Sequence, residues 1–104
     1  MPKAARRSAD YEVWHGDSLV GSLWDVTGDR AAAVCRFVPG RGWEAVRPLF
    51  AAQEEWRLQS FSEGLVWAAI GVRKLGVELR PPHGGEPFRP RSIYLDERSA
   101  SFRG

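Results

Sequence analysis

The sequence contains no asparagine, one cysteine and two histidines among its 104 residues. Because Cys35 has no second cysteine to pair with, an internal disulfide is excluded, and a reducing cytoplasm is the expected location. The residues best suited to bind a transition metal, His15, Cys35 and His83, do not have the close spacing of a metal site. We therefore expect neither a metal nor a cofactor.

Long apolar runs are also missing. The longest run, from Leu65 to Ile70, has six residues, whereas a membrane-spanning helix needs about 20. The basic N-terminal segment is not followed by an apolar stretch, so a secretory signal is not expected. The length suits one domain, and the chain shows neither an internal repeat nor a linker. We expect a flexible tail at residues 1–9 and a single domain at residues 10–104.

Lysine is scarce, since 13 of the 15 basic residues are arginine. The formal net charge is only +2, and the basic excess lies mainly in residues 64–104. Arginine binds phosphate well, but here it is spread along the chain. This distribution fits the codon usage of a GC-rich genome better than a dedicated nucleic-acid surface.

The first part of the sequence predicts three strands. Residues 11–15, 19–26 and 31–38 are rich in strand-forming side chains, and short polar turns at 16–18 and 27–30 separate them. Strands joined by such tight turns pair as an antiparallel meander.

The middle of the sequence predicts two helices. The first is expected at residues 47–58, with Pro48 in its first turn, where proline is tolerated. Ser60 and Glu63 have the spacing of a capping box before the second helix, and Gly76 is placed to end that helix. The apolar face of the second helix has helical periodicity and comprises Phe61, Leu65, Ala68, Ala69, Val72 and Leu75.

The last part predicts a short strand at 77–80 and a hairpin of strands at 92–95 and 99–103. The complete order of elements indicates an α+β fold. We expect an antiparallel sheet, made of the N-terminal three-stranded meander and the C-terminal strand and hairpin, with both helices packed on one face.

Residues 16–19, Gly-Asp-Ser-Leu, are similar to the nucleophile block of the GDSL hydrolases, whose serine attacks esters. In that family an Asp-x-x-His block supplies the acid and base, and a Gly-x-Asn-Asp block supplies an oxyanion donor. Here Glu12 and Arg80 stand three residues before the two histidines, and asparagine is absent. The family's parallel-sheet scaffold is also about twice as long. We therefore interpret the segment as a turn, and a small serine hydrolase using Ser18 is the least favoured function.

The aromatic residues indicate a core and a surface for binding. Trp14, Trp24, Phe37, Phe50 and Phe61 are expected at the interface of helices and sheet. Trp43, Trp56 and Trp67 are harder to bury together, and exposed tryptophans often anchor protein partners. The favoured function is therefore non-catalytic: binding of another protein, or self-association, through Trp43, Trp56 and Trp67.

Nucleic-acid binding is the main alternative. Arginines near the C-terminus alternate with Phe88, Tyr94 and Phe102, and such a mixture can combine phosphate contacts with base stacking. The chain has no recognisable DNA- or RNA-binding motif, so this function ranks second. The candidate surface for an anion or a nucleic acid comprises Arg80, Arg89, Arg91, Arg98 and Arg103.

Several segments together resemble a group of small bacterial α+β proteins that has no assigned activity. The resemblance spans most of the chain from Tyr11, and it implies no particular function. In that group the last hairpin turns on Asp-Gly, whereas Glu97-Arg98 stands here, which implies a different turn. The segments that carry the resemblance are Phe37-x-Pro39, Trp43-Glu44-Ala45-Val46-Arg47-Pro48-Leu49-Phe50, Leu75-Gly76-Val77-x-Leu79, Ile93-Tyr94-Leu95-Asp96 and Ala100-x-Phe102-Arg103.

Overall fold

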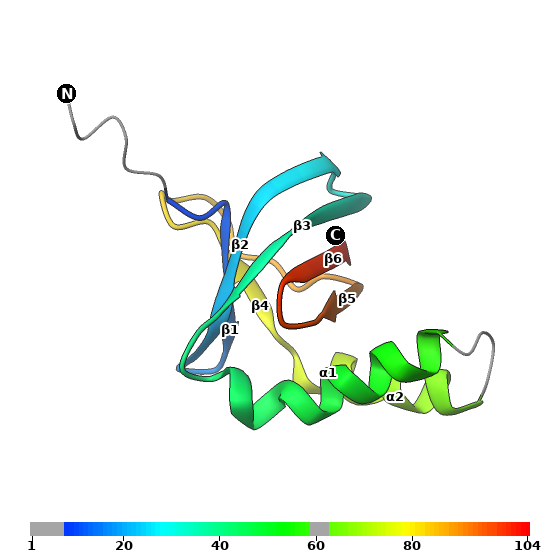
Figure 1. The fold of residues 1–104 in the computed structure, drawn as a ribbon. Helices are drawn as coiled ribbons and strands as arrows, with labels where there is room; N and C mark the ends of the chain where they lie inside the picture. The colour runs from blue at the N-terminus through cyan, green and yellow to red at the C-terminus, as the bar shows by residue number, and fades with distance from the viewer. Residues whose placement is uncertain (1–7, 59–62) are drawn as a thin grey trace.

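The computed structural model describes residues 8–58 and 63–104 of the chain. Most of the expected tail at 1–9, and most of the expected capping box at 60–63, lie outside these residues. In the described part, six strands and two helices follow the predicted order (Figure 1). They are β1 (Tyr11–His15), β2 (Ser18–Asp29), β3 (Ala32–Pro39), α1 (Trp43–Leu58), α2 (Glu63–Leu75), β4 (Glu78–Arg80), β5 (Ser92–Leu95) and β6 (Ser99–Arg103).

The strands form one antiparallel sheet in the order β4-β1-β2-β3-β6-β5, which confirms the predicted α+β architecture. The sheet curls into a half-barrel (Figure 1). Phe88 pairs with Leu79 of β4 through two backbone hydrogen bonds of 2.8 and 3.0 Å. Inside the curl, the Tyr11 ring meets the edges of Phe88 and Phe102, each at 5.7 Å between centroids. These aromatic contacts hold strands from distant parts of the sheet together.

Side-chain alternation places the core on the concave face of the sheet. On β3, Ala33, Cys35 and Phe37 are buried while their neighbours are exposed, as the alternating sequence predicts. Val13 of β1 and Leu79 of β4 are also fully buried. This face receives α1, so that the core lies between the helix and the curled sheet.

The prediction that Trp14 and Trp24 belong to the core is wrong. Trp14 follows the buried Val13 and so lies on the other face of β1. On β2, an irregularity in the pairing with β1 changes the alternation, so that Val20 and Leu23 are buried and Trp24 is not. Val13 is opposite Gly21 and Trp14 is opposite Leu19, so Val20 is the extra residue of a bulge. Both indoles therefore lie half-buried on the outer face. Each donates a hydrogen bond to a neighbour on its own strand and has an arginine over its ring.

The predicted start of the first helix at residue 47 is also wrong. The helix begins at Trp43, which places Pro48 inside it and removes one helical hydrogen bond. The Trp43 ring lies 5.0 Å from Phe37 and 5.9 Å from Phe50, measured between centroids. Gly42, immediately before the helix, donates its N–H to the Leu19 carbonyl. Burial of Trp43 therefore determines where the helix begins, in spite of the proline.

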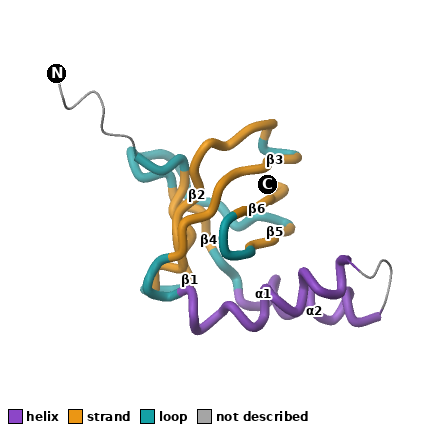
Figure 2. The backbone as a smooth tube through the Cα atoms, viewed as in Figure 1, coloured by secondary structure: helices purple, strands orange, loops and turns teal. Residues whose placement is uncertain are grey.

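Helix α2 packs against α1 to form a hairpin of helices beneath the sheet (Figure 2). Ala68 and Val72, from the predicted apolar face, are buried, whereas Phe61 lies outside the described residues. A β-carbon on Gly71 would lie 3.0 Å from the Leu49 side chain, so the two helices approach closely there. Gly76 has φ +70° and ends the helix as predicted.

The turn between β5 and β6 is built around the carboxylate of Asp96. Its Oδ1 accepts the N–H groups of Arg98 at 2.8 Å and of Ser99 at 2.9 Å. These hydrogen bonds, the one from Arg98 first, lower the pKa of Asp96, because they stabilise the charged form. None of residues 96–98 has a positive φ, so this turn does not need the glycine of an Asp-Gly turn.

We predict that Gly21→Ala destabilises the fold by about 2 kcal/mol or more, the usual range for overpacking a core. The new methyl group would occupy the position of the Phe37 ring and press on the Val38 carbonyl. Chemical denaturation measures the effect. Ser18→Ala, at the exposed start of the same strand, is the control and should unfold like the wild type. Equal stability of the two variants would show that the ring moves aside freely.

Candidate functional site

Ser18 lies in the hairpin between β1 and β2, as the turn interpretation predicts. It pairs with His15 across the two strands, and Gly16 adopts φ +58° in the turn between them. The Ser18 side chain is exposed and borders Gly42. Within the described residues, no hydrogen bond joins the hydroxyl to an imidazole. A serine nucleophile needs a base in that position, so the geometry provides no activation of this hydroxyl.

Cys35 lies in the core with 6 % of its surface exposed. Burial, with a smaller contribution from the charge of Asp10, raises the pKa of the thiol to about 11. A thiol in this state is a poor nucleophile and a poor metal ligand. Across residues 8–58 and 63–104, no group of three or more histidine, cysteine or acidic side chains is placed to bind a metal.

The structure separates the three tryptophans that were predicted to form a partner surface. Trp43 is only 3 % exposed and belongs to the core, so its assignment to the surface is wrong. Its burial follows from the contacts with Phe37 and Phe50. Trp67 on α2 is 71 % exposed and Trp56 near the end of α1 is 37 % exposed.

Trp56 and Trp67 are two of five large apolar side chains that are exposed on the helical hairpin. The end of this hairpin extends past the sheet (Figure 1). We call the five side chains the hairpin patch, and they are Trp56, Leu58, Val66, Trp67 and Ile70. Isolated apolar residues are common on protein surfaces, but a cluster of this kind is typical of an interaction site.

A groove adjoins the hairpin patch, because Val66 and Ile70 border both. It lies between α2 and the segment 89–94, and has a volume of about 610 Å³. Gln53 of α1 lies at its base, where it is 2 % exposed and donates a hydrogen bond of 2.8 Å to the Ile93 carbonyl. Ala69, Val77, Pro90 and Ile93 contribute apolar surface to the walls.

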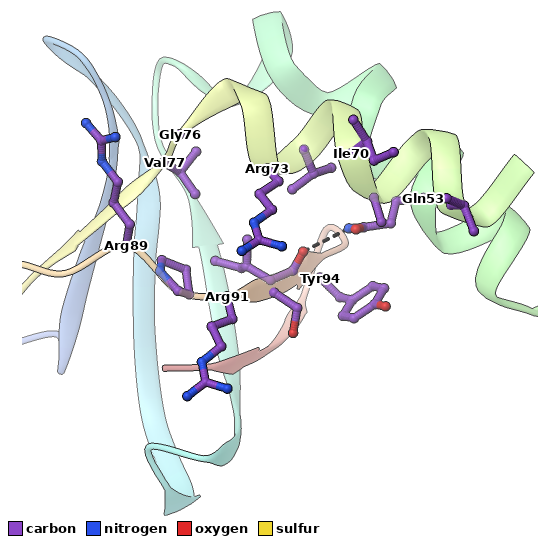
Figure 3. A pocket seen from close by; sticks show the side chains of 14 residues that line it. Gln53, Ile70, Arg73, Gly76, Val77, Arg89, Arg91 and Tyr94 are labelled. Carbon is purple, nitrogen blue, oxygen red and sulfur yellow. Dashed lines mark hydrogen bonds between the residues drawn. The ribbon is translucent and has the colours of Figure 1, made fainter.

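Three arginines line this groove (Figure 3). Arg73 extends from α2 toward the segment 89–93, and Arg91 extends from that segment. Arg89 is turned toward the end of α2, with its Nη1 close to Gly76, where a cation interacts favourably with the helix dipole. Arg89 and Arg91 belong to the predicted anion surface, whereas Arg73 was not predicted to belong to it. The position of Arg73 seven residues after Val66, on the same side of α2, is the signal that could have identified it.

The remaining arginines of the predicted nucleic-acid surface lie elsewhere. Arg80 is on the outer face of β4, where it pairs with Glu78 at 2.6 Å and covers the Trp14 ring. Arg98 is in the β5–β6 turn, and Arg103 ends β6. Phe102 is buried and therefore unavailable for stacking on a base. The five arginines thus do not form one continuous surface with the neighbouring aromatic rings.

Comparison with known proteins adds no relative. No protein-family model, curated protein or solved structure matches the chain. The resemblance to small bacterial proteins therefore stays an expectation. Neither α1 nor α2, the helices of the described part, combines the length and the apolar character needed to cross a membrane.

We predict that Cys35 reacts slowly with iodoacetamide at pH 8 in the folded protein. With a pKa of about 11, about one thiol in a thousand is ionised at that pH, and burial also blocks the reagent. Mass spectrometry should show labelling at least about a hundredfold slower than in protein unfolded by guanidinium. Similar rates in the two states would contradict the buried position of the thiol.

Proposed function

We propose that this protein is a non-catalytic interaction domain that binds a protein partner, or a second copy of itself, through the hairpin patch. The observation that carries the proposal is the set of large apolar side chains that are exposed on α1 and α2, in a helical hairpin whose end extends past the sheet (Figure 1). A catalytic role has no support from the surroundings of Ser18 or Cys35.

The distribution of buried residues along α1 supports this proposal. The buried side chains of α1 are Trp43, Val46, Phe50 and Gln53, all within the part of the helix that faces the sheet. After Gln53, Arg57 still lies over the Tyr94 ring of β5, whereas Trp56 and Leu58 are exposed. On α2, the large apolar side chains of Val66, Trp67 and Ile70 are also exposed. Burial of such side chains in an interface would be favourable.

Trp67 is the strongest candidate for the anchor of such an interface. Tryptophan contributes a large, rigid contact surface and is enriched among residues that dominate binding energy. A partner that covers Trp67 would also cover Val66, the next residue on the helix, and these two residues form the exposed centre of the α2 part of the patch.

Nucleic-acid binding has less support as the alternative. The arginines expected to bind phosphates are dispersed, and Arg80 already has a carboxylate partner. Two aromatic rings that were expected to stack on bases are covered by arginine side chains. Arg57 lies over the Tyr94 ring, and Arg30 lies over the Phe88 ring. We retain the cytoplasm as the proposed location, because the one cysteine is a free thiol.

The proposal predicts that Val66→Ser combined with Trp67→Ser disrupts association while the fold is preserved. The control is Val34→Ser on the sheet, because Val34 is 59 % exposed and Val66 is 58 % exposed. Sedimentation velocity over a range of concentrations measures self-association. Crosslinking in lysate, followed by mass spectrometry with the same three proteins, measures binding to another partner.

Association of the wild type and of Val34→Ser, with loss in the double variant, is the expected result. A wild-type protein that sediments as a monomer at all concentrations, and whose crosslinks are unchanged in the double variant, would refute the proposal. Circular dichroism should show that the double variant is folded, since exposed side chains contribute little to stability.

A further inference from the structure

We propose that the groove between α2 and the segment 89–94, with Arg73 and Arg91, binds a small molecule that carries a carboxylate or phosphate group on an apolar body. This proposal does not rest on the proposed protein interaction. Although Val66 and Ile70 border both surfaces, Trp67 is not part of the groove. The two proposals can therefore fail separately.

The charge of the groove is the first argument for an anionic ligand. Among the residues that the structure describes, no aspartate or glutamate lines the groove. Ion pairs are formed by four other arginines, Arg36, Arg47, Arg57 and Arg80. Among the described residues, Arg73 and Arg91 have no carboxylate partner of this kind. These two permanently charged groups come from opposite walls of the groove, and each favours an anionic ligand.

The geometry of the guanidinium group narrows the choice of anion. Its N–H groups match the spacing of two oxygens on a carboxylate or phosphate and can form paired hydrogen bonds. Arg73 is on a helix, and Arg91 immediately precedes β5 and donates its N–H to the Arg103 carbonyl at 2.7 Å, so both side chains extend from hydrogen-bonded backbone. Arg89 is less suited to the role because it lies near the end of α2.

The walls of the groove indicate that the ligand has an apolar part. A volume of about 610 Å³ is within the range of roughly 300–1,000 Å³ that is usual for small-molecule sites. Ala69, Ile70 and Val77 line one side, and Pro90 and Ile93 line the other. An inorganic anion alone would leave this surface exposed to water, whereas an alkyl or aryl body would cover it.

The test uses decanoate and decyl phosphate as probes, with decanol as the uncharged control, all below their aggregation limits. Nuclear magnetic resonance titration of ¹⁵N-labelled protein locates the binding site, and calorimetry gives the affinity. The variants are Arg73→Gln, Arg91→Gln and Ala69→Phe, the last of which fills the groove without changing its charge. Arg98→Gln, in the exposed turn outside the groove, and Trp67→Ser, in the hairpin patch, are the controls.

We expect saturable shifts at the amides of Ala69, Ile70, Arg73 and Arg91 with both anionic probes. Each arginine variant should weaken binding about tenfold or more, and Ala69→Phe should abolish it. Arg98→Gln and Trp67→Ser should bind normally. The tighter of the two probes identifies the anionic group of the ligand.

Three results would each overturn the proposal. They are equal binding of decanol, unchanged affinity in both arginine variants, or shifts centred on Trp67 in place of the groove. In the last case the probes would be reporting the hairpin patch, and the proposed function would stand without the ligand site. If the probes bind in the groove but the protein shows no association, the ligand site would stand and the proposed function would fail.

Discussion

Trp43 packs between Phe37 at the end of β3 and Phe50 on α1, and this contact joins the helical hairpin to the curled sheet. The loop before it is fixed by backbone hydrogen bonds from Gly40 and Gly42 to β2. Together these interactions determine where α1 begins and in which direction it leaves the sheet. The buried indole N–H finds no hydrogen-bond partner among the described residues, a cost of about 1–3 kcal/mol. The position is retained because the ring buries a large apolar surface.

Both candidate surfaces follow from the direction of α1. A helix of 16 residues is about 24 Å long, and the end of the hairpin that it forms with α2 extends past the sheet (Figure 1). This overhang creates the hairpin patch. On the other side, α2 lies beside the edge strand β5 with the Gln53 amide at the base, and the space between them is the groove.

The sequence predicts most of the elements but few of the relations between them. The strands at 92–95 and 99–103 were predicted with their correct bounds, because alternation and turn residues are local signals. Trp24 was assigned to the wrong face, since a bulge is decided by pairing with another strand and not by the strand itself. Arg73 and Arg91 are 18 positions apart in the sequence, so only the packing of α2 beside β5 places them on one groove. Charge and periodicity predict the structure of each segment separately. The groove depends on how the segments pack together, which these local patterns do not specify.

The most direct test of this account compares the free energy of unfolding of Trp43→Ala and Trp67→Ala. If Trp43 holds the helical hairpin to the sheet, its truncation should destabilise the protein by about 3–5 kcal/mol. Truncation of Trp67 should change stability by less than about 0.5 kcal/mol, because its side chain faces solvent. Equal losses in the two variants, or a larger loss for Trp67→Ala, would contradict the assignment of one tryptophan to the core and the other to a binding surface.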